Sequence, residues 1–270
     1  MSQLVSTEEP VQYEVRSRAA WITLASPATR NALSGPMIEA LGCSLERSID
    51  DAAVRVIVLT GTGPVFCAGA DLKGGGVAVT QGGGGRNPFV TILSRLWDGP
   101  KPVVVAANGN AFGGGVGLIA AADVAIAVEG GTFAFSEVRV GVIPAMISVV
   151  VLPKIGVHHA MRLFLTGRRF DARDALAYGL VHRVVPADGL AAAVAEEIDA
   201  IAQGGPIAVT EAKRLVRTVA RLPMEDAFAY AETKIAELFA SAEAAEGMAA
   251  FAERRKPAWV DRDEADPAAG

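Results

Sequence analysis

Two glycine-rich corners of the sequence have the residue types needed to hold a developing oxyanion. Residues 68–70 (Ala-Gly-Ala) follow a short apolar run, and residues 113–115 (Gly-Gly-Gly) come a few positions after the apolar run 103–107. A backbone N–H can approach a ligand carbonyl only where side chains are absent, so such corners suit an oxyanion hole. If the second corner opens a helix, the helix N-terminus adds partial positive charge. Taken singly, each corner is more often a tight turn than a site.

Glu137 is the acid–base candidate of the sequence. It lies among apolar neighbours, Phe135 on one side and Val138 and Val140 on the other, which predicts a partly desolvated carboxyl. Loss of water disfavours the charged form of a carboxyl and raises its pKa toward a range useful for proton transfer. The alternative is a surface or structural glutamate. Beside the two corners, proton transfer is the better interpretation.

The other polar candidates give weaker signals. For Asp123, a cap or turn role is a better interpretation than catalysis. Cys43 and Cys67 have neither CxxC spacing nor a histidine at ligand spacing, so we predict two buried small side chains, no disulfide and no metal site. Three histidines are interpreted as structural: His158, His159 and His182.

Composition and charge exclude several classes of protein. The chain has 270 residues, 51% of them hydrophobic, and a formal net charge of −5. A generic polyanion binder carries an excess of basic residues, so we expect no nucleic-acid partner. The N-terminal residues lack the features of a signal peptide, and the apolar runs 103–107 and 115–127 are too short to span a bilayer. We therefore expect a cytoplasmic protein with no membrane association.

Alternating strand-like and helix-like segments must position these residues. Units of strand, corner and helix repeat along roughly the first two hundred residues, which predicts an α/β fold with one main core. Ser34 offers an N-cap for an amphipathic helix that runs to about Asp51. Beyond Pro206 strand signals vanish, and three segments carry apolar residues at helical spacing: 206–219, 224–239 and 242–256.

These patterns predict three regions. Residues 1–200 form the core with the active site, 201–260 form a helical C-terminal region for packing or oligomerisation, and 261–270 form a flexible tail. Within the core, the low-complexity stretch 74–85 is predicted to be a flexible loop. The apolar stripes of the three C-terminal helices are too strong for them to stand alone, so we expect them to pack on the core or on a neighbouring subunit.

The order of motifs along the chain resembles the crotonase superfamily, which contains the enoyl-CoA hydratases and isomerases. The resemblance covers roughly residues 13 to 259, and its motifs are spread along that length. In chain order they read CAGADLK (67–73), KPV (101–103), NGNAFGGG (108–115), FSE (135–137), GVIP (141–144), LTG (165–167), AYGLV (177–181), EGMAAF (246–251) and KP (256–257).

The resemblance implies a fold, a substrate and a set of roles. The fold would be a right-handed crotonase-like spiral of repeated ββα units with a helical C-terminal region, assembled as homotrimers or dimers of trimers. The amides of Ala70 and Gly114 would hold the thioester oxygen of an acyl-CoA substrate and stabilise the enolate. Arg30 would lie near the CoA diphosphate, and Lys256 would approach CoA from the C-terminal helix. Four residues match the segment that lies against the CoA adenine and phosphates: Ala68, Asp71, Leu72 and Lys73. No cofactor beyond the CoA moiety of the substrate is implied.

The sequence departs from the family pattern in two places. Hydratases of the family use two glutamates, and the positions that match are Gly117 and Glu137, so one carboxylate is missing. After Pro144, where many hydratases have glycines, this chain has Ala-Met-Ile-Ser (145–148). With these features it looks most like bacterial methylglutaconyl-CoA-type hydratases. We predict hydration of a 2-enoyl-CoA, with branched and carboxylated acyl groups among the candidates.

Three alternatives stay open. The first is a 3-enoyl-CoA to 2-enoyl-CoA isomerase that uses Glu137 alone, and the second is a non-catalytic acyl-CoA binder. The third is a dinucleotide-binding fold, because residues 115–120 (Gly-Val-Gly-Leu-Ile-Ala) satisfy GxGxxA. Such a fingerprint normally starts directly after the first strand, whereas here residues 108–114 intervene and the motif falls in mid-chain.

Overall fold

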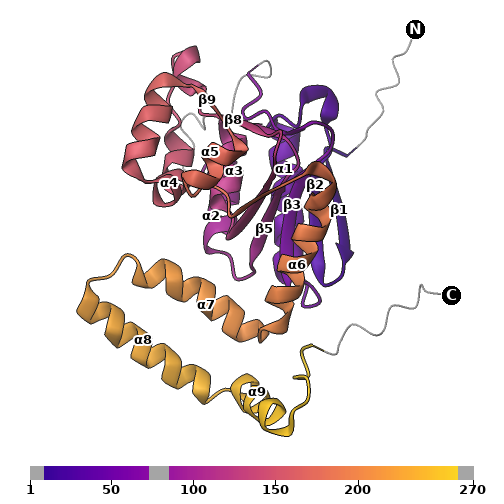
Figure 1. Ribbon diagram of the computed structural model, residues 1–270, viewed down its shortest axis with the longest axis vertical. Helices are drawn as coiled ribbons and strands as arrows, with labels where there is room; N and C mark the ends of the chain where they lie inside the picture. Colours follow the sequence, from indigo (N-terminus) through magenta and orange to yellow (C-terminus); the bar gives the residue numbers. More distant parts are fainter. Residues whose placement is uncertain (1–8, 73–84, 261–270) are drawn as a thin grey trace, which may run out of the picture.

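Two β-sheets form the framework of the protein (Figure 1). The computed structural model describes residues 9–72 and 85–260. In this part of the chain the larger sheet has the order β1 (Val11–Arg16), β2 (Ala19–Leu24), β3 (Val56–Gly61), β5 (Val103–Ala107), β7 (Val124–Val128) and β10 (Arg183–Val185). The smaller sheet has the order β4 (Val65–Cys67), β6 (Asn110–Phe112), β8 (Thr132–Ala134) and β9 (Arg169–Asp171).

The connections between the sheets confirm an α/β fold of repeated ββα units. In the successive pairs β3–β4, β5–β6 and β7–β8, the first strand joins the larger sheet and the second joins the smaller one. A helix follows each of the first two pairs, α2 (Pro88–Asp98) and then α3 (Gly114–Ala121). Each unit adds its strands parallel to those of the preceding unit, so the chain winds as a spiral.

Alternate residues of the central strands contribute side chains to two separate hydrophobic cores. On β3, Ile57 and Leu59 belong to the main core, whereas Val56 and Val58 pack on the opposite face. Because side chains alternate across a strand, a run of apolar residues is the pattern expected of a strand that is covered on both faces. The helix α6 (Leu190–Gln203) covers this second face with residues such as Val194 and Ile198.

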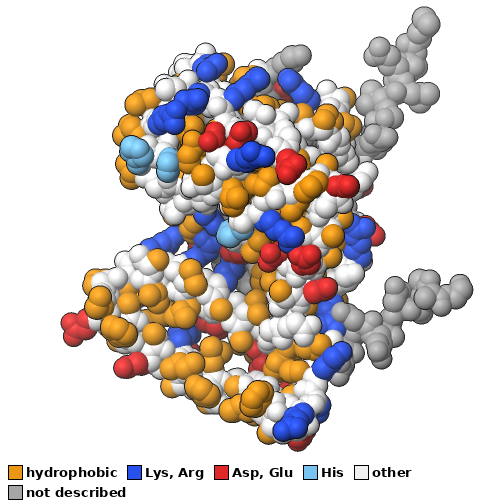
Figure 2. All heavy atoms as spheres, viewed as in Figure 1, with side chains coloured by type: hydrophobic (Ala, Val, Ile, Leu, Met, Phe, Trp, Pro, Cys, Tyr) orange, Lys and Arg blue, Asp and Glu red, His pale blue; other side chains and the backbone are white. Residues whose placement is uncertain are grey.

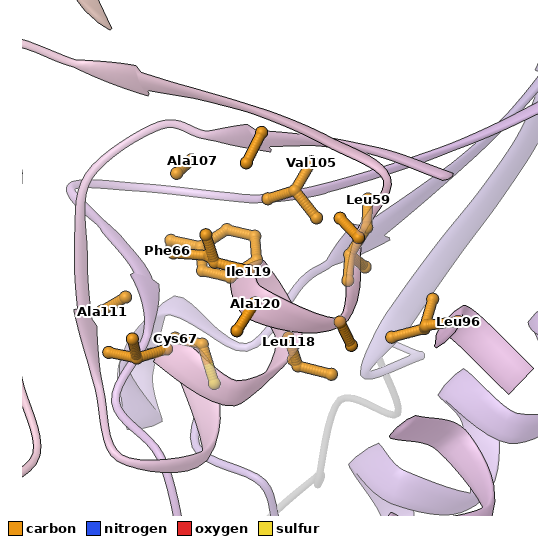
Figure 3. Close-up of a cluster of buried hydrophobic side chains, with 14 of the residues drawn as sticks. Leu59, Phe66, Cys67, Leu96, Val105, Ala107, Ala111, Leu118, Ile119 and Ala120 are labelled. Carbon is orange, nitrogen blue, oxygen red and sulfur yellow. The ribbon is translucent and has the colours of Figure 1, made fainter. Parts of the chain in front are cut away.

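The main core fills the space between the two sheets and around α3 (Figure 3). Phe66 and Cys67 of β4 lie against Leu118, Ile119 and the neighbouring alanines of α3, and seven of the eight residues of this helix are buried. The helices α1 (Gly35–Asp50) and α4 (Ala145–Thr166) contribute further side chains to the same core. The predicted N-cap is confirmed, since the Ser34 side chain accepts a hydrogen bond from the Met37 amide. These elements hold the N-terminus of α3 in a fixed place.

Helix α4 is kinked and belongs to the core. It has the length and apolar composition of a membrane-crossing helix. However, Pro153 lies inside it and Gly156 interrupts the helical conformation with φ of 68°. Its side chains Ile147, Val151 and Ile155 are buried in the main core. An interrupted helix with one face packed on the core is explained by packing within the fold.

The C-terminal helices form a separate layer beside the core (Figure 1). They are α7 (Pro206–Val219), α8 (Met224–Phe239) and α9 (Ala242–Glu253), in close agreement with the predicted ranges. Asp123 at the start of β7 forms ion pairs of 2.7 Å with both Lys213 and Arg217 of α7. The Arg217 guanidinium also stacks 3.6 Å from the Trp97 ring centroid. These contacts hold α7 to the core, and a cavity of about 700 Å³ lies between them.

Some predictions fall outside the described residues. The low-complexity loop 74–85 does so except for Gly85, and so do Lys73 and the predicted tail 261–270. The division at residue 200 stays a prediction. One prediction is wrong: Cys43 is exposed on α1, because that position faces away from the core-facing stripe of the helix, whereas Cys67 is buried as expected.

Candidate active site

The two glycine-rich corners meet at one edge of the smaller sheet. Strands β4 and β6 are parallel neighbours, so the segments that follow them emerge side by side. A Cβ placed on Gly69 would lie 2.5 Å from the Phe112 carbonyl oxygen and 3.3 Å from the Gly114 nitrogen. A Cβ on Gly115 would lie 2.5 Å from the Cys67 carbonyl oxygen. The glycines are therefore required by close backbone approach, and not only by the turns.

Each corner presents an unpaired backbone amide. Gly114 is the first residue of α3, and the first amides of a helix have no acceptor within it. Ala70 forms a bridge to Leu33 in which the Leu33 amide donates to the Gly69 carbonyl at 2.8 Å. Among the described residues, no group accepts a hydrogen bond from the amide of Ala70 or of Gly114. Two unpaired donors on adjoining segments have the form of an oxyanion hole.

Glu137 places its carboxyl group beside these corners. It is the first residue of the 3₁₀ turn η2 (Glu137–Val140), and its Oε1 lies 2.9 Å from the position of a Cβ on Gly113. Its Oε2 is buried without a hydrogen-bond partner in the described part of the chain. Burial raises the pKa of Glu137, and a hydrogen bond from the backbone opposes this rise. A desolvated carboxyl with an unused oxygen can exchange a proton with a ligand held at the corners.

A cavity with three arginines adjoins the first corner. Arg30 follows the turn η1 (Pro27–Thr29) in the left-handed conformation, and its carbonyl accepts a hydrogen bond of 3.0 Å from the Ala68 amide. The cavity has a volume of about 280 Å³ and is lined by Arg30, Ala68, Phe112, Ala134, Ser136, Arg139, Gly167 and Arg169. None of the three arginines forms an ion pair with a described residue. This positive cavity is suited to a negatively charged group.

The other residues predicted to contact CoA are less closely grouped. Asp71 is half-buried directly after Ala70, and Leu72 is 65% exposed, while Lys73 lies outside the described residues. Lys256 follows α9, which lies at the opposite end of the molecule from β8 and β9 (Figure 1). Within one chain the structure therefore does not bring Lys256 to the corners.

Asn31 holds the first corner in place and was not singled out by the sequence. It is fully buried in the left-handed conformation, which asparagine adopts more readily than most residues. Its Oδ1 accepts from the Ser26 amide at 2.9 Å, and its Nδ2 donates to the carbonyls of Val65 at 2.8 Å and Thr62 at 3.0 Å. Asn31 thereby clamps the turn that carries Arg30 to strand β4. In the sequence, the only indication of this role is the position of Asn31 directly after Arg30 in a turn.

The weaker candidates have structural roles. Asp123 pairs with α7 and accepts a hydrogen bond from the Val103 amide, as expected for a residue that orders the chain. The His182 Nδ1 accepts from the Ala125 amide at 3.1 Å. In residues 9–72 and 85–260, no cluster of three or more metal-ligating side chains occurs. The GxGxxA motif starts inside α3, after the helix has begun, so it does not form the strand-to-helix turn of a dinucleotide site.

Comparison with known proteins identifies the family to which this chain belongs. A family model described as Enoyl-CoA hydratase/isomerase matches residues 14–262. Carnitinyl-CoA dehydratase of Proteus mirabilis is 36% identical over 243 residues, which cover 86% of this chain and 91% of the relative.

Solved structures show the same fold. An enoyl-CoA hydratase/isomerase from Marinobacter aquaeolei superposes with a TM-score of 0.86 at 32% identity, over 94% of this chain and all of the other. An enoyl-CoA hydratase from Shewanella pealeana gives a TM-score of 0.85 at 31% identity, over 93% of this chain and 96% of the other. With the match along nearly its whole length, this chain belongs to the enoyl-CoA hydratase/isomerase family and has the crotonase fold.

Proposed function

We propose that this protein is a lyase that hydrates a 2-enoyl-CoA. The observation that carries the proposal is the meeting of two unpaired amides, those of Ala70 and Gly114, with the desolvated carboxyl of Glu137. Donors of this kind stabilise charge that develops on a carbonyl oxygen, and a carboxyl beside them can transfer protons at the adjoining carbons. The names of related proteins, a hydratase and a dehydratase of CoA esters, favour the same reaction class.

The proposed reaction uses Glu137 for every proton. The thioester oxygen accepts hydrogen bonds from the amides of Ala70 and Gly114. As the oxygen of a water molecule adds to C3, one water proton passes to the Glu137 carboxylate, and the electrons of the double bond move toward the thioester oxygen as an enolate. Glu137 then gives that proton to C2, which regenerates the carboxylate. The net change is the addition of water across the C2–C3 double bond.

The CoA moiety is proposed to bind along the first corner. Ala68, Asp71, Leu72 and Lys73 would face the adenine and phosphates, as the family resemblance implies. The cavity lined by Arg30, Arg139 and Arg169 supports this placement, because guanidinium groups that form no ion pair with a described residue attract phosphate. No metal and no cofactor other than CoA enters the proposal. Since α9 lies far from this site within one chain, Lys256 would have to come from a neighbouring subunit.

We also propose that the enzyme is a cytoplasmic homotrimer or dimer of trimers. The described residues support assembly through the C-terminal layer, because neither α7 nor α8 has a buried residue although both carry apolar side chains. Figure 2 shows many apolar side chains on the visible face of this layer. An exposed apolar surface of this extent marks an interaction site.

A second candidate function is isomerisation of a 3-enoyl-CoA to a 2-enoyl-CoA. The observation that favours it is Gly117. Of the two positions at which hydratases of the family carry glutamates, only Glu137 has a carboxylate in this chain. Glu137 would remove a proton from C2 and return it to C4 through an enolate held by the same amides. A non-catalytic acyl-CoA binder is the third possibility, and it is disfavoured by the unpaired, desolvated carboxyl.

The experiment is a side-by-side assay of crotonyl-CoA, a 3-enoyl-CoA and methylglutaconyl-CoA, with products identified by chromatography and mass spectrometry. Hydration predicts a product 18 mass units heavier than the 2-enoyl-CoA substrate, a mass increase of one water. Isomerisation predicts a product of unchanged mass from the 3-enoyl-CoA alone. Binding of the CoA esters without any product would contradict both enzymatic functions.

A further inference from the structure

Two positions one turn apart on α3 have very different neighbours. Gly113 caps the helix, and its carbonyl accepts a hydrogen bond of 3.1 Å from the Gly117 amide. A Cβ on Gly113 would lie 2.9 Å from the Glu137 carboxyl. A Cβ on Gly117 would lie 2.3 Å from Ile147 Cγ2 and 2.9 Å from Ile147 Cβ. The carboxyl of Glu137 therefore lies beside the start of α3, and the side chain of Ile147 lies beside the same helix one turn further on.

Ile147 leaves no space for a side chain at position 117. It is 3% exposed and lies in the first turn of α4. A β-branched side chain has few allowed rotamers, and rotation moves Cγ2 but not Cβ. Because the Ile147 Cβ itself is too close, any side chain on Gly117 would have to displace the backbone of α4. Ile147 thus occupies the space that a side chain at position 117 would need.

The consequence concerns the number of acids in the site. Side chains one helical turn apart are neighbours, so a carboxylate at position 117 would lie next to Glu137. The structure has the methyl groups of Ile147 at that place. An apolar wall cannot hold a water molecule by hydrogen bonds, and it cannot supply a second proton donor.

We propose that the Gly117–Ile147 pair restricts this active site to one carboxylate, and that Ile147 is a specificity-determining residue that decides which acyl-CoA reaction the site performs. The inference rests on the proposed function for its catalytic part. Glu137 alone then handles each proton, and substrates that need two carboxylates to hold a water molecule are disfavoured. Restoring a glutamate at position 117 without removing Ile147 does not create a two-carboxylate site.

The steric conflict between positions 117 and 147 is tested by a double-mutant cycle, in which the Tm of the single and double variants is measured by thermal unfolding. Gly117→Ala is expected to lower the Tm by about 5 °C or more, although alanine normally favours a helix over glycine. Gly42→Ala is the matched control, because a Cβ there meets nothing within 4 Å in the middle of α1. It should leave the Tm unchanged or raise it.

Removal of Ile147 should relieve the conflict. In the background of Ile147→Gly, Gly117→Ala should cost less than about 2 °C. In the background of Ile147→Ala, which removes Cγ2 but keeps Cβ, the cost should fall only in part. The alanine background keeps the cycle measurable if the glycine variant is too unstable. The steric claim is overturned if Gly117→Ala behaves like Gly42→Ala, or if its cost is the same with and without Ile147.

The catalytic part compares Gly117→Glu/Ile147→Gly with Gly117→Gln/Ile147→Gly. The glutamate version should add a second ionisation to the pH dependence of kcat/KM for crotonyl-CoA. It should also raise the ratio of hydration to isomerisation by roughly tenfold or more. Identical pH profiles and ratios for the two double variants would overturn the inference.

The two proposals fail in different ways. If the unaltered enzyme converts no enoyl-CoA while the thermal cycle shows the predicted coupling, the proposed function is wrong and the steric restriction stands. If the enzyme is active and the cycle shows no coupling, the restriction is wrong and the proposed function stands.

Discussion

At the scale of single residues, Glu137 has an unusual environment for a carboxyl. Within residues 9–72 and 85–260, its Oε2 has no hydrogen-bond partner and no cation forms an ion pair with the carboxylate. Burial is the main cause of its raised pKa. A group in such a place costs folding stability whenever it is ionised, which is typical of residues kept for chemistry.

The raised pKa of Glu137 predicts a pH-dependent gain in stability on replacement. Between its ordinary carboxyl pKa and its raised folded pKa, the folded state binds a proton more readily than the unfolded chain, so this group destabilises the fold as pH rises. Glu137→Gln should therefore match the unaltered protein near pH 4 and have the higher Tm near pH 7. Differential scanning fluorimetry across this range measures the effect, and Glu39→Gln on the exposed face of α1 is the control. A Tm difference that is constant with pH would contradict the assignment.

The sequence alone predicts some of the residues of the candidate site and not others. The family resemblance assigned the amides of Ala70 and Gly114, and the structure places both corners beside Glu137. The corners and Glu137 could be predicted from local patterns, namely glycine runs and a carboxyl flanked by apolar residues. Asn31 and Ile147 could not. Their importance comes from contacts with residues more than 25 positions away, and a single sequence contains no signal for such contacts.

At the scale of elements, the turn between β2 and α1 positions the first corner. The Leu33 amide bonds to the Gly69 carbonyl and the Ala68 amide bonds to the Arg30 carbonyl, so this turn and the corner move as one unit. Asn31 connects the same turn to β4. The geometry of the Ala70 amide therefore depends on a turn 40 residues earlier in the chain.

Asn31→Ala tests this connection. It leaves the Val65 and Thr62 carbonyls and the Ser26 amide without their partner, which should cost on the order of 2–4 kcal/mol of stability. Because the turn carries Arg30, the KM for acyl-CoA should rise more than kcat falls.

Asn110→Ala is the matched control for this prediction. Asn110 accepts a hydrogen bond from Thr132 between β6 and β8, away from the turn. Its loss should lower the Tm less and leave KM nearly unchanged. Equal effects of the two substitutions on KM and Tm would show that Asn31 has no special role at the corner.

The success of element prediction followed the strength of local periodicity. For α7 and α8, the ends predicted from the apolar stripes coincide with the observed first and last residues. Strands β6 and β9 have three residues each, which is too short for a periodic pattern to indicate a strand. In α4, Pro153 and Gly156 are of types that usually interrupt a helix, but the element continues through the kink, where Val151 and Ile155 are buried in the main core.

At the scale of the whole molecule, the C-terminal layer exposes large apolar side chains in a single chain. Along α8, Met224 is 77% exposed, Phe228 64%, Ile235 53% and Phe239 63%. At helical spacing these four side chains lie on one face. Most of the apolar surface of α8 is therefore left uncovered by its own chain, which supports the proposed assembly.

Phe228→Asp is expected to weaken self-association. A charge in the centre of an apolar interface must be desolvated, so the trimer or hexamer should dissociate at concentrations where the unaltered protein stays assembled. Light scattering after size-exclusion chromatography measures the mass. Thr233→Asp, on the opposite face of α8, is the control and should leave the mass unchanged. If Phe228→Asp keeps the mass of the unaltered protein, this face is not the interface.

Glu137 is proposed to transfer protons to a thioester held by the amides of Ala70 and Gly114. The most direct measurement is the turnover of an accepted enoyl-CoA by Glu137→Gln, together with its Kd for a saturated acyl-CoA. Glutamine keeps the size of the side chain and removes its ability to accept and return a proton. If Glu137 has this role, kcat should fall by roughly 10²- to 10⁴-fold while Kd changes by less than about threefold. A variant with near-normal kcat would contradict it.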